Sequence, residues 1–306
     1  MKGAVYVNGT ISAADKAVVP VYDHGLLYGE GVYETLRTYN MIPFLYERHC
    51  ARLRASARYL ELDEPFSDDE LRRAIDDTVA AAGPMTEAYI RVLLTRGVGE
   101  LTYDLKATPT PTLIVIVKPF DEPPPRVFED GIKISLVSIL RNHPGSVNPI
   151  IKSNNLLNNA LAMQEAHRRG GEEALMCNYR GELAECAQSN FFMVRGGVAL
   201  TPRSEAGLLE GITRDFIFDV GDEAGIRVEK ATLTPADLDA ADEAFLTGST
   251  REISPVVASD ERVSGTGKPG PITLKLLEVF RRMARAMSTS GPAARPRTPQ
   301  SAGTSR

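Results

Sequence analysis

Three consecutive prolines interrupt this sequence and constrain how the chain can fold. They lie in the run DEPPP at residues 121–125. Consecutive prolines favour extended polyproline II backbone, so we expect a stiff linker at residues 121–130. A chain of 306 residues is long enough to build two modest cores. The sequence therefore predicts a small N-terminal domain at residues 1–120 and a larger domain at residues 131–287.

The first predicted domain contains helix signals between strand-like runs. The apolar spacing within residues 48–60 is typical of a helix with one buried face. A second helix should begin at Ser67, because the run SDDE at residues 67–70 has the spacing of a capping box. Apolar and β-branched runs at residues 88–95 and 112–120 predict two strands that complete this domain.

The second predicted domain has shorter strand signals and several helices. Strands are expected at residues 133–140, 173–179, 191–194 and 198–202. Helices are expected from Lys152 to the glycines at 170 and 171, at residues 211–224 before Gly225, and at residues 270–287. Residues 288–306 have almost no bulky apolar side chains, so a disordered tail is expected there. Strands and helices in both halves predict an α+β fold.

Composition excludes several classes of function. The net charge of −5 gives no electrostatic basis for binding nucleic acid or an anionic membrane. No apolar run approaches the ~18 residues of a membrane helix, and the N-terminus lacks the apolar core of a signal peptide, so a cytoplasmic location is expected. Cys50, Cys177 and Cys186 have no metal-ligand spacing. Neither a disulfide framework nor a metal site is therefore expected.

Three features of the second domain match the needs of one cofactor. The amine of Lys152 can form an imine with an aldehyde and can then move a proton at a substrate Cα. The carboxylate of Glu185 can keep a pyridine nitrogen protonated. The helix that opens with Gly211, Ile212 and Thr213 can bind phosphate through free backbone N–H groups. Each feature alone is ordinary, as a surface lysine, a turn carboxylate and a helix start, but together they predict a pyridoxal 5'-phosphate enzyme.

Ordered motifs along residues 1–287 resemble one family. They are YDHGLLYGEGVYETLRTYN (22–40), the pair Arg52-Leu53, AYIRVLLTRGVGEL (88–101), AECAQSNFFMV (184–194), LLEGITRD (208–215) and LTGSTREISPV (246–256). In this order the motifs resemble the fold type IV pyridoxal phosphate enzymes, also called class IV aminotransferases. The resemblance implies a two-domain α+β fold, with a small α/β domain and a larger domain whose short strands form a barrel-like core. It also implies an active site between the domains that is completed in at least a homodimer.

The resemblance assigns cofactor roles to individual residues. It implies that Lys152 is the Schiff-base lysine, that Glu185 faces the pyridine nitrogen and that Leu209 lies against one face of the ring. The residues that it places around the phosphate are Arg52, Ile212, Thr213, Ser249 and Thr250.

Substrate positions match the branched-chain members of the family best. Tyr28, Tyr33, Tyr89 and Arg91 correspond to their substrate pocket, and a strand period of two puts Tyr89 and Arg91 on one face. A tyrosine hydroxyl and a guanidinium suit a carboxylate, while the tyrosine rings suit an aliphatic side chain. The resemblance implies transamination of branched-chain L-amino acids with a 2-oxo acid such as 2-oxoglutarate. The alternative interpretation of Tyr89 and Arg91 is a half-buried pair that holds the sheet together.

Several positions depart from the branched-chain pattern and leave other functions open. Leu157 stands where that subgroup commonly has tyrosine, which makes the lysine region similar to the D-amino acid transaminases. Thr35 stands where many have glycine and is similar to the aminodeoxychorismate lyases. Leu101 and Tyr103, however, replace the arginine and histidine with which D-amino acid enzymes bind the substrate carboxylate. An R-selective amine transaminase and a non-catalytic binding protein are the remaining alternatives.

Overall fold

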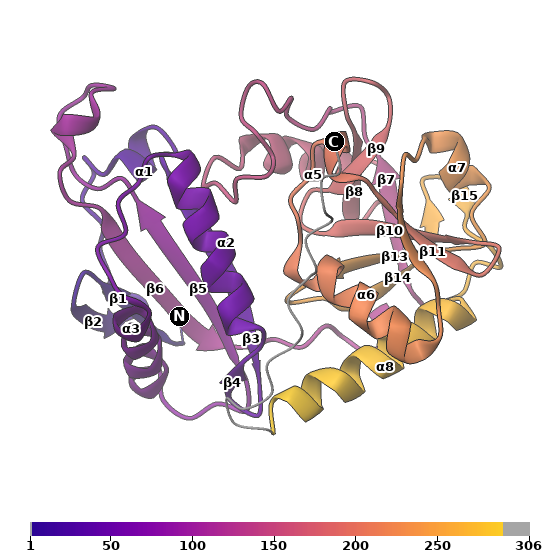
Figure 1. Cartoon of the computed structure of the whole chain (residues 1–306), viewed down its shortest axis with the longest axis horizontal. Coiled ribbons are helices and arrows are strands. Elements are labelled where there is room, and N and C mark those ends of the chain that lie inside the picture. The colour runs from indigo at the N-terminus through magenta and orange to yellow at the C-terminus, as the bar shows by residue number, and fades with distance from the viewer. Residues whose placement is uncertain (1, 290–306) are drawn as a thin grey trace, which may run out of the picture.

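The computed structural model describes residues 2–289, which form two units side by side, each with its own sheet and helices (Figure 1). We call them the first layer and the second layer. The first sheet has six antiparallel strands in the order β2-β1-β6-β5-β3-β4. Their bounds are Ala4–Val7 (β1), Thr10–Ala13 (β2), Gly31–Tyr39 (β3), Ile42–Pro43 (β4), Ala88–Thr95 (β5) and Thr112–Pro119 (β6). The accompanying helices are His24–Leu27 (α1), Tyr46–Tyr59 (α2), Asp68–Ala81 (α3) and the short 3-10 turn Leu105–Ala107 (η1).

Alternation along β5 fixes which face of this sheet is covered by helices. Ile90, Val92 and Leu94 are buried and belong to the same apolar cluster as Leu53 and Ala57 of α2. The intervening side chains of β5 are only half-buried because they point to the opposite face. That opposite face is available to line a site beside the second layer.

The second sheet has nine strands in the order β12-β11-β10-β13-β14-β7-β8-β9, with β15 paired to β14. Their bounds are Ile132–Leu136 (β7), Glu173–Cys177 (β8), Leu183–Cys186 (β9), Asn190–Arg195 (β10), Val198–Pro202 (β11), Val228–Ala231 (β12), Glu243–Gly248 (β13), Glu252–Ser259 (β14) and Arg262–Val263 (β15). The remaining helices are Arg126–Glu129 (α4), Leu157–Arg168 (α5), the 3-10 turn Ser204–Ala206 (η2), Ile212–Ala224 (α6), Pro235–Asp239 (α7) and Pro271–Met287 (α8). Both faces of this curled sheet are covered, so β10 reads as a continuous apolar run: Phe192 packs toward α6 and α8, while Phe191 and Met193 pack into a second cluster.

Aromatic packing and hydrogen bonds join the two layers. The ring of Phe44, just before α2, lies 5.5 Å from that of Phe216 and 5.9 Å from that of Phe280, measured between centroids. The hydroxyl of Tyr39 donates to Oε1 of Glu252 at 2.6 Å. These contacts fix the first layer against the helices of the second.

The predicted α+β class and most predicted elements are confirmed. The capping box at Ser67 is present in full, because its hydroxyl accepts from the Glu70 N–H and the Glu70 carboxylate accepts from the Ser67 N–H. Helix α6 ends at Gly225, whose φ of 65° is the left-handed conformation that favours glycine. The domain boundary at residues 121–130 stays a prediction, although the two sheets fall on either side of it.

Three predicted ends of helices and strands were wrong, and a helix lies within the expected linker. Helix α5 begins at Leu157 and not at Lys152, because Ser153 accepts a hydrogen bond from the Asn155 N–H at 3.0 Å and holds the intervening chain in a turn. The predicted linker contains helix α4, since a proline can open a helix although it cannot continue one. The strands expected to end at residues 140 and 179 end at Leu136 and Cys177.

Only residues 288 and 289 of the predicted disordered tail lie within the described structure. Ser288 is buried and its hydroxyl donates to the Ala284 carbonyl, so α8 ends in an ordered cap there. Residues 290–306 lie outside the described residues. Within residues 2–289, no helix is both long enough and apolar enough to cross a membrane. The expected cytoplasmic location stays a prediction.

Candidate active site

Lys152 lies in an extended segment that is held from two sides. Its carbonyl accepts from the Tyr33 N–H at 2.9 Å, and Ser153 forms a bridge with Val32 of β3. Its own N–H donates to the hydroxyl of Ser56 on α2 at 3.1 Å. The side chain then extends so that Nζ lies 4.5 Å from the centroid of the Tyr33 ring. The lysine is thus placed by backbone contacts that leave its amine free.

A cavity surrounds this amine and reaches Glu185. It encloses about 580 Å³ of empty space, part of which is open solvent. Four of the residues that the sequence predicted for the site line it together: Tyr33, Lys152, Glu185 and Leu209.

Burial tunes the Lys152 amine for chemistry. Desolvation, and next the positive charge of Arg52, lower the pKa of Lys152 to about 8. Among the described residues Nζ has neither a hydrogen-bond partner nor an ion-pair partner. A substantial fraction of the amine is therefore neutral near pH 7 to 8 and can act as a nucleophile or a base.

Glu185 is a buried carboxylate with three donors. Its Oε1 accepts from Arg141 Nε at 2.8 Å, and its Oε2 accepts from the Leu209 N–H at 3.1 Å and from Asn190 Nδ2 at 3.2 Å. Burial raises the pKa of Glu185, and the charge of Arg141 opposes that rise. Sequence reasoning missed Arg141 and Asn190. Asn190 lies inside one of the motifs, but Arg141 follows a strand with no local signal of its role.

The first backbone N–H groups of α6 have no partner among the described residues. Gly211 caps the helix without a side-chain hydrogen bond, and the first intrahelical bond runs from the Asp215 N–H to the Gly211 carbonyl. A Cβ at Gly211 would lie 1.9 Å from Asn190 Oδ1, so only glycine fits this close approach. Ile212 and Thr213 follow directly, at the end of the helix where an anion is stabilised.

Two more predicted phosphate residues reach the same region from other elements. Arg52 of α2 donates from Nη1 to the Glu210 carbonyl, next to Gly211, at 2.8 Å. The hydroxyl of Ser249, in the turn between β13 and β14, lies 3.5 Å from Nε2 of His49, one helical turn before Arg52. Thr250 follows Ser249 in that turn.

The predicted substrate residues are only partly brought together. Arg91 Cζ lies 4.0 Å from the centroid of the Tyr33 ring, and Thr35 is paired with Arg91 across β3 and β5. Tyr89 lies further along the same face of β5, where the amine of Lys118 is 5.5 Å from its ring centroid.

Tyr28 lies apart from this group. It follows α1, and its ring centroid is 5.1 Å from that of Tyr103. Leu157 is 66% exposed at the start of α5. Neither Tyr28 nor Leu157 lines the Lys152 cavity.

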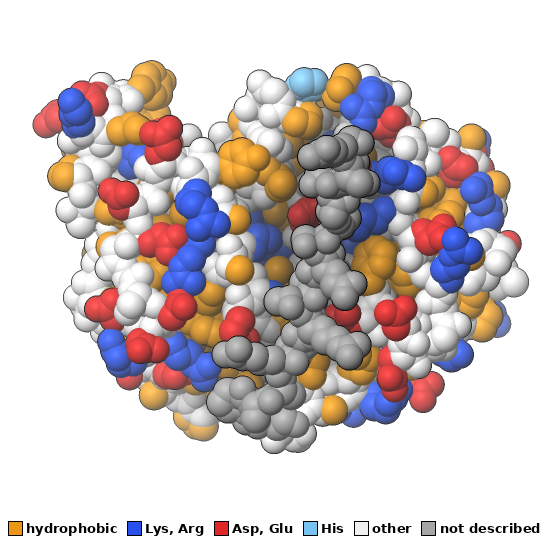
Figure 2. Space-filling view, viewed as in Figure 1, with side chains coloured by type: hydrophobic (Ala, Val, Ile, Leu, Met, Phe, Trp, Pro, Cys, Tyr) orange, Lys and Arg blue, Asp and Glu red, His pale blue; other side chains and the backbone are white. Residues whose placement is uncertain are grey.

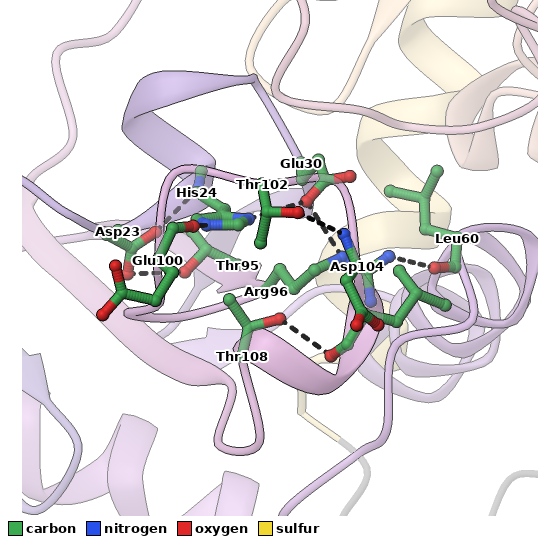
Figure 3. A network of polar contacts seen from close by, with 12 residues as sticks. Asp23, His24, Glu30, Leu60, Thr95, Arg96, Glu100, Thr102, Asp104 and Thr108 are labelled. Carbon is green, nitrogen blue, oxygen red and sulfur yellow. Dashed lines mark hydrogen bonds and ion pairs between the residues drawn. The ribbon is translucent and has the colours of Figure 1, made fainter.

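A buried polar network holds the loop that carries Tyr103 (Figure 3). The carboxylate of Asp23 accepts from the hydroxyls of Thr95 and Thr112 at 2.9 and 2.8 Å. His24 Nε2 donates to the Glu100 carbonyl at 2.9 Å. The loop after β5 is therefore anchored to α1 by buried side chains.

Comparisons with known proteins identify the family. Residues 31–258 match the amino-transferase class IV family. The chain is 39% identical to a protein of Methanocaldococcus jannaschii that carries the provisional name of a branched-chain-amino-acid aminotransferase, over 90% of this chain and 95% of that one. It is 36% identical to the D-alanine aminotransferase of Listeria monocytogenes, over 90% and 94%. The crystal structure of Escherichia coli branched-chain amino acid aminotransferase aligns with a TM-score of 0.89 at 30% identity, over 96% and 98%.

The chain belongs to the class IV aminotransferases and is a fold type IV enzyme that depends on pyridoxal 5'-phosphate. The residues present fit that cofactor. A free buried amine, a buried carboxylate in the same cavity and an uncapped helix start beside an arginine match the aldehyde, the ring nitrogen and the phosphate.

Proposed function

We propose that this aminotransferase takes branched-chain L-amino acids as amino donors and a 2-oxo acid such as 2-oxoglutarate as acceptor. The observation that carries the proposal is Arg91. Its guanidinium stacks on Tyr33 beside the Lys152 amine, and among the described residues it has no carboxylate partner and no hydrogen-bond partner. A half-buried cation without a counterion at the edge of the site is suited to a substrate carboxylate. The rings of Tyr33 and Tyr89 offer apolar surface to an aliphatic side chain.

The proposed roles of the site residues follow from their positions. Bound pyridoxal phosphate supplies an electron sink for the charge that forms at the substrate Cα. Lys152 takes the Cα proton and returns it, which its lowered pKa permits near neutral pH. Glu185 holds a proton at the ring nitrogen, and Leu209 covers one face of the ring. Arg52, Ile212, Thr213, Ser249 and Thr250 hold the phosphate.

A D-amino acid transaminase is the second candidate. Leu157, in place of tyrosine, and the 36% identity to a D-alanine aminotransferase favour it. Against it, the loop positions that would bind a D-amino acid carboxylate hold Leu101 and Tyr103, which have no cationic side chain. Arg91 therefore supports the branched-chain proposal more strongly than Leu157 supports this one.

We also propose that the enzyme acts as a homodimer. Exposed apolar side chains lie on two segments that are far apart in sequence, the chain that leads into and through α1 and the loop after β5: Val18, Val21 and Leu26 are 79%, 68% and 65% exposed, and Leu101 and Tyr103 are 65% and 82% exposed. The segments are joined by the Asp23 to Val98 bridge. Such a patch on an anchored scaffold is typical of an interface.

Charged surface offers no comparable feature on the face in Figure 2, where Lys and Arg side chains are interspersed with Asp and Glu. A second copy on the apolar patch would also account for Tyr28, which lies beside Tyr103 and away from the cavity of its own chain.

The half-reaction tests the donor. The purified enzyme with its cofactor is mixed with L-leucine or with D-alanine, without an acceptor, and the visible absorption of the lysine-bound cofactor is followed. We expect L-leucine to discharge the band and D-alanine to leave it. Discharge by D-alanine alone would favour the second candidate, and no discharge by either would favour the lyase and amine alternatives.

A further inference from the structure

The carboxylate of Glu34 is buried between strand β3 and helix α2. Its residue is 1% exposed, because the alternation of β3 points Glu34 to the same helix-covered face as Val32 and Leu36. A charge buried between a strand and a helix is unfavourable unless it is fully paired. Its Oε1 accepts from Arg52 Nε at 2.7 Å, and its Oε2 accepts from Arg52 Nη2 at 2.8 Å. Glu34 therefore engages one edge of the guanidinium with both oxygens.

This pairing fixes which donors of Arg52 remain available. A guanidinium has five N–H donors in a rigid plane. Glu34 takes two of them, and the Glu210 carbonyl takes a third. The remaining two have no partner among the described residues and belong to the end of the guanidinium, beside Gly211 and the uncapped start of α6. Arg52 is thus oriented before any ligand arrives.

His49 connects the Glu34 carboxylate to the turn after β13. Its Nδ1 lies 2.6 Å from Glu34 Oε2, and its Nε2 lies 3.5 Å from the hydroxyl of Ser249. Burial lowers the pKa of His49, and the contact with Glu34 opposes that fall. Nδ1 donates to Glu34, and Nε2 faces the Ser249 hydroxyl. Glu34, His49 and Arg52 come from the first layer, whereas Glu210 and Ser249 come from the second.

We propose that Glu34 is a positioning residue for the cofactor phosphate, because it fixes the Arg52 guanidinium at the start of α6 and, through His49, the turn that carries Ser249. The inference rests on the proposed placement of the phosphate at Arg52 and α6. It makes the phosphate site a clamp between the two layers, oriented by a residue that does not touch the cofactor.

Two effects of Glu34 on phosphate binding oppose each other. Its negative charge reduces the attraction between Arg52 and a phosphate. Its two oxygens remove the rotational freedom that a long side chain would otherwise lose on binding. In Glu34→Gln the amide nitrogen would stand either in place of Oε1, facing Nε of Arg52, or in place of Oε2, facing Nη2 of Arg52 and Nδ1 of His49. Either placement sets donor against donor. Because the mismatch is buried, we expect the loss of orientation to exceed the gain in charge.

The experiment compares three variants of the full-length enzyme loaded with cofactor. Glu34→Gln tests the inference, and Arg52→Gln tests the phosphate placement on which it rests. Glu64→Gln is the matched control. Glu64 Oε2 lies 2.6 Å from Nε of Arg54, which is on the same helix as Arg52, and this pair is away from the site. Cofactor release after dilution is followed by absorbance, and affinities are measured for pyridoxal phosphate and for pyridoxal, which lacks the phosphate.

We expect Glu34→Gln and Arg52→Gln to weaken binding of pyridoxal phosphate by roughly tenfold or more, the equivalent of one charge-assisted hydrogen bond. Binding of pyridoxal should change by less than about twofold, and Glu64→Gln should match the parent enzyme. A general structural defect would weaken the binding of both ligands alike. The ratio of the affinity for pyridoxal phosphate to the affinity for pyridoxal therefore reports the phosphate contact alone.

Together, Arg52→Gln and Glu34→Gln distinguish a wrong phosphate placement from a wrong role for Glu34. If Arg52→Gln leaves the ratio unchanged, the phosphate placement is wrong and the inference falls with it. If Arg52→Gln lowers the ratio but Glu34→Gln leaves it equal or raises it, the placement stands and the positioning role is wrong. Should Glu34→Gln fail to fold, Glu34→Asp decides, because its shorter side chain keeps the charge but does not bring the carboxylate within hydrogen-bond distance of Nε and Nη2. An unchanged ratio in Glu34→Asp would overturn the inference.

Discussion

Two buried carboxylates at this site each pair with an arginine, yet their pKa values move in opposite directions. Burial would raise the pKa of Glu34, but Arg52 and His49 lower it far below the usual range. Burial raises the pKa of Glu185, and its single contact with Arg141 Nε only partly offsets that rise. Both carboxylates are buried and each accepts from three donors, so the charge of the donors decides the outcome: a guanidinium makes two of the three contacts with Glu34 but only one of the three with Glu185.

The difference assigns different work to the two residues. A carboxylate with a depressed pKa stays ionised at all working pH values, and it is suited to holding a guanidinium in place. A carboxylate with a raised pKa is closer to sharing a proton with a neighbour, as a pyridine nitrogen requires. Lys152 lies within the field of both carboxylates, which oppose the lowering of its pKa.

Removing the Lys152 amine should have the largest effect. We expect Lys152→Ala to lower the transamination rate by at least about a thousandfold, because no other described side chain offers a free amine in the cavity. The rate with L-leucine and 2-oxoglutarate measures this, and circular dichroism checks the fold. Lys133→Ala, at an exposed lysine on β7, is the control. Near-normal turnover in Lys152→Ala would remove the basis of the assignment.

Glu185→Gln should separate catalysis from cofactor retention. An amide cannot hold the ring nitrogen protonated, so we expect kcat to fall by on the order of a hundredfold. The phosphate contacts stay intact, so the cofactor should remain bound through gel filtration. Loss of the cofactor at an unchanged kcat would show that Glu185 and Glu34 have exchanged roles.

Arg91→Met should affect substrate binding and leave both carboxylates undisturbed. Losing the unpaired guanidinium beside Tyr33 removes a charge-assisted contact, so we expect KM for 2-oxoglutarate to rise by about tenfold with kcat nearly unchanged. Arg58→Met, at an exposed position of α2, is the control. An unaltered KM would mean that Arg91 and Tyr89 only hold the sheet together.

The pH dependence of cofactor capture should report the Lys152 amine. Only the neutral amine attacks an aldehyde, and the neutral fraction falls as the pH drops below the pKa of about 8. The rate at which cofactor-free enzyme captures pyridoxal phosphate should rise by about tenfold from pH 7 to pH 9 and then level off. A rate that continues to climb toward pH 10.5 would indicate an ordinary, solvated lysine.

The smallest effect is expected at a residue away from the Glu34–Arg52 and Glu185–Arg141 pairs. Ser67→Ala removes the hydroxyl that caps α3 and should lower the free energy of unfolding by about 1 kcal/mol. Urea denaturation measures this loss, and kcat and cofactor affinity should not change. A change in cofactor affinity would show that the first layer transmits strain to the site.

Sequence patterns predicted much of this site because its chemistry depends on residue type. Lys152 and Glu185 are found from the aldehyde and pyridine chemistry, and the α6 start from the glycine before an apolar helix. The same patterns misplaced the start of α5, because a Ser153 turn competes with the helix over only a few residues. Local hydrogen bonds of this kind are too weak to stand out in a sequence.

The positioning residues could not be predicted from spacing. Glu34 and Arg52 are 18 positions apart, and Arg141 and Glu185 are 44 positions apart, on separate elements. Nothing in the local sequence distinguishes a carboxylate that will be buried against an arginine from one on the surface. Such pairs become visible only when the fold brings strand and helix faces together.

The division of labour between Glu34 and Glu185 is tested most directly by one pair of spectra. Enzyme loaded with cofactor, carrying either Glu34→Gln or Glu185→Gln, is scanned between pH 6 and pH 9 before and after gel filtration. We predict that Glu185→Gln shifts the absorption of the bound cofactor and retains it, whereas Glu34→Gln leaves the absorption unshifted and loses cofactor on the column. A shifted spectrum in Glu34→Gln with full retention would contradict the account.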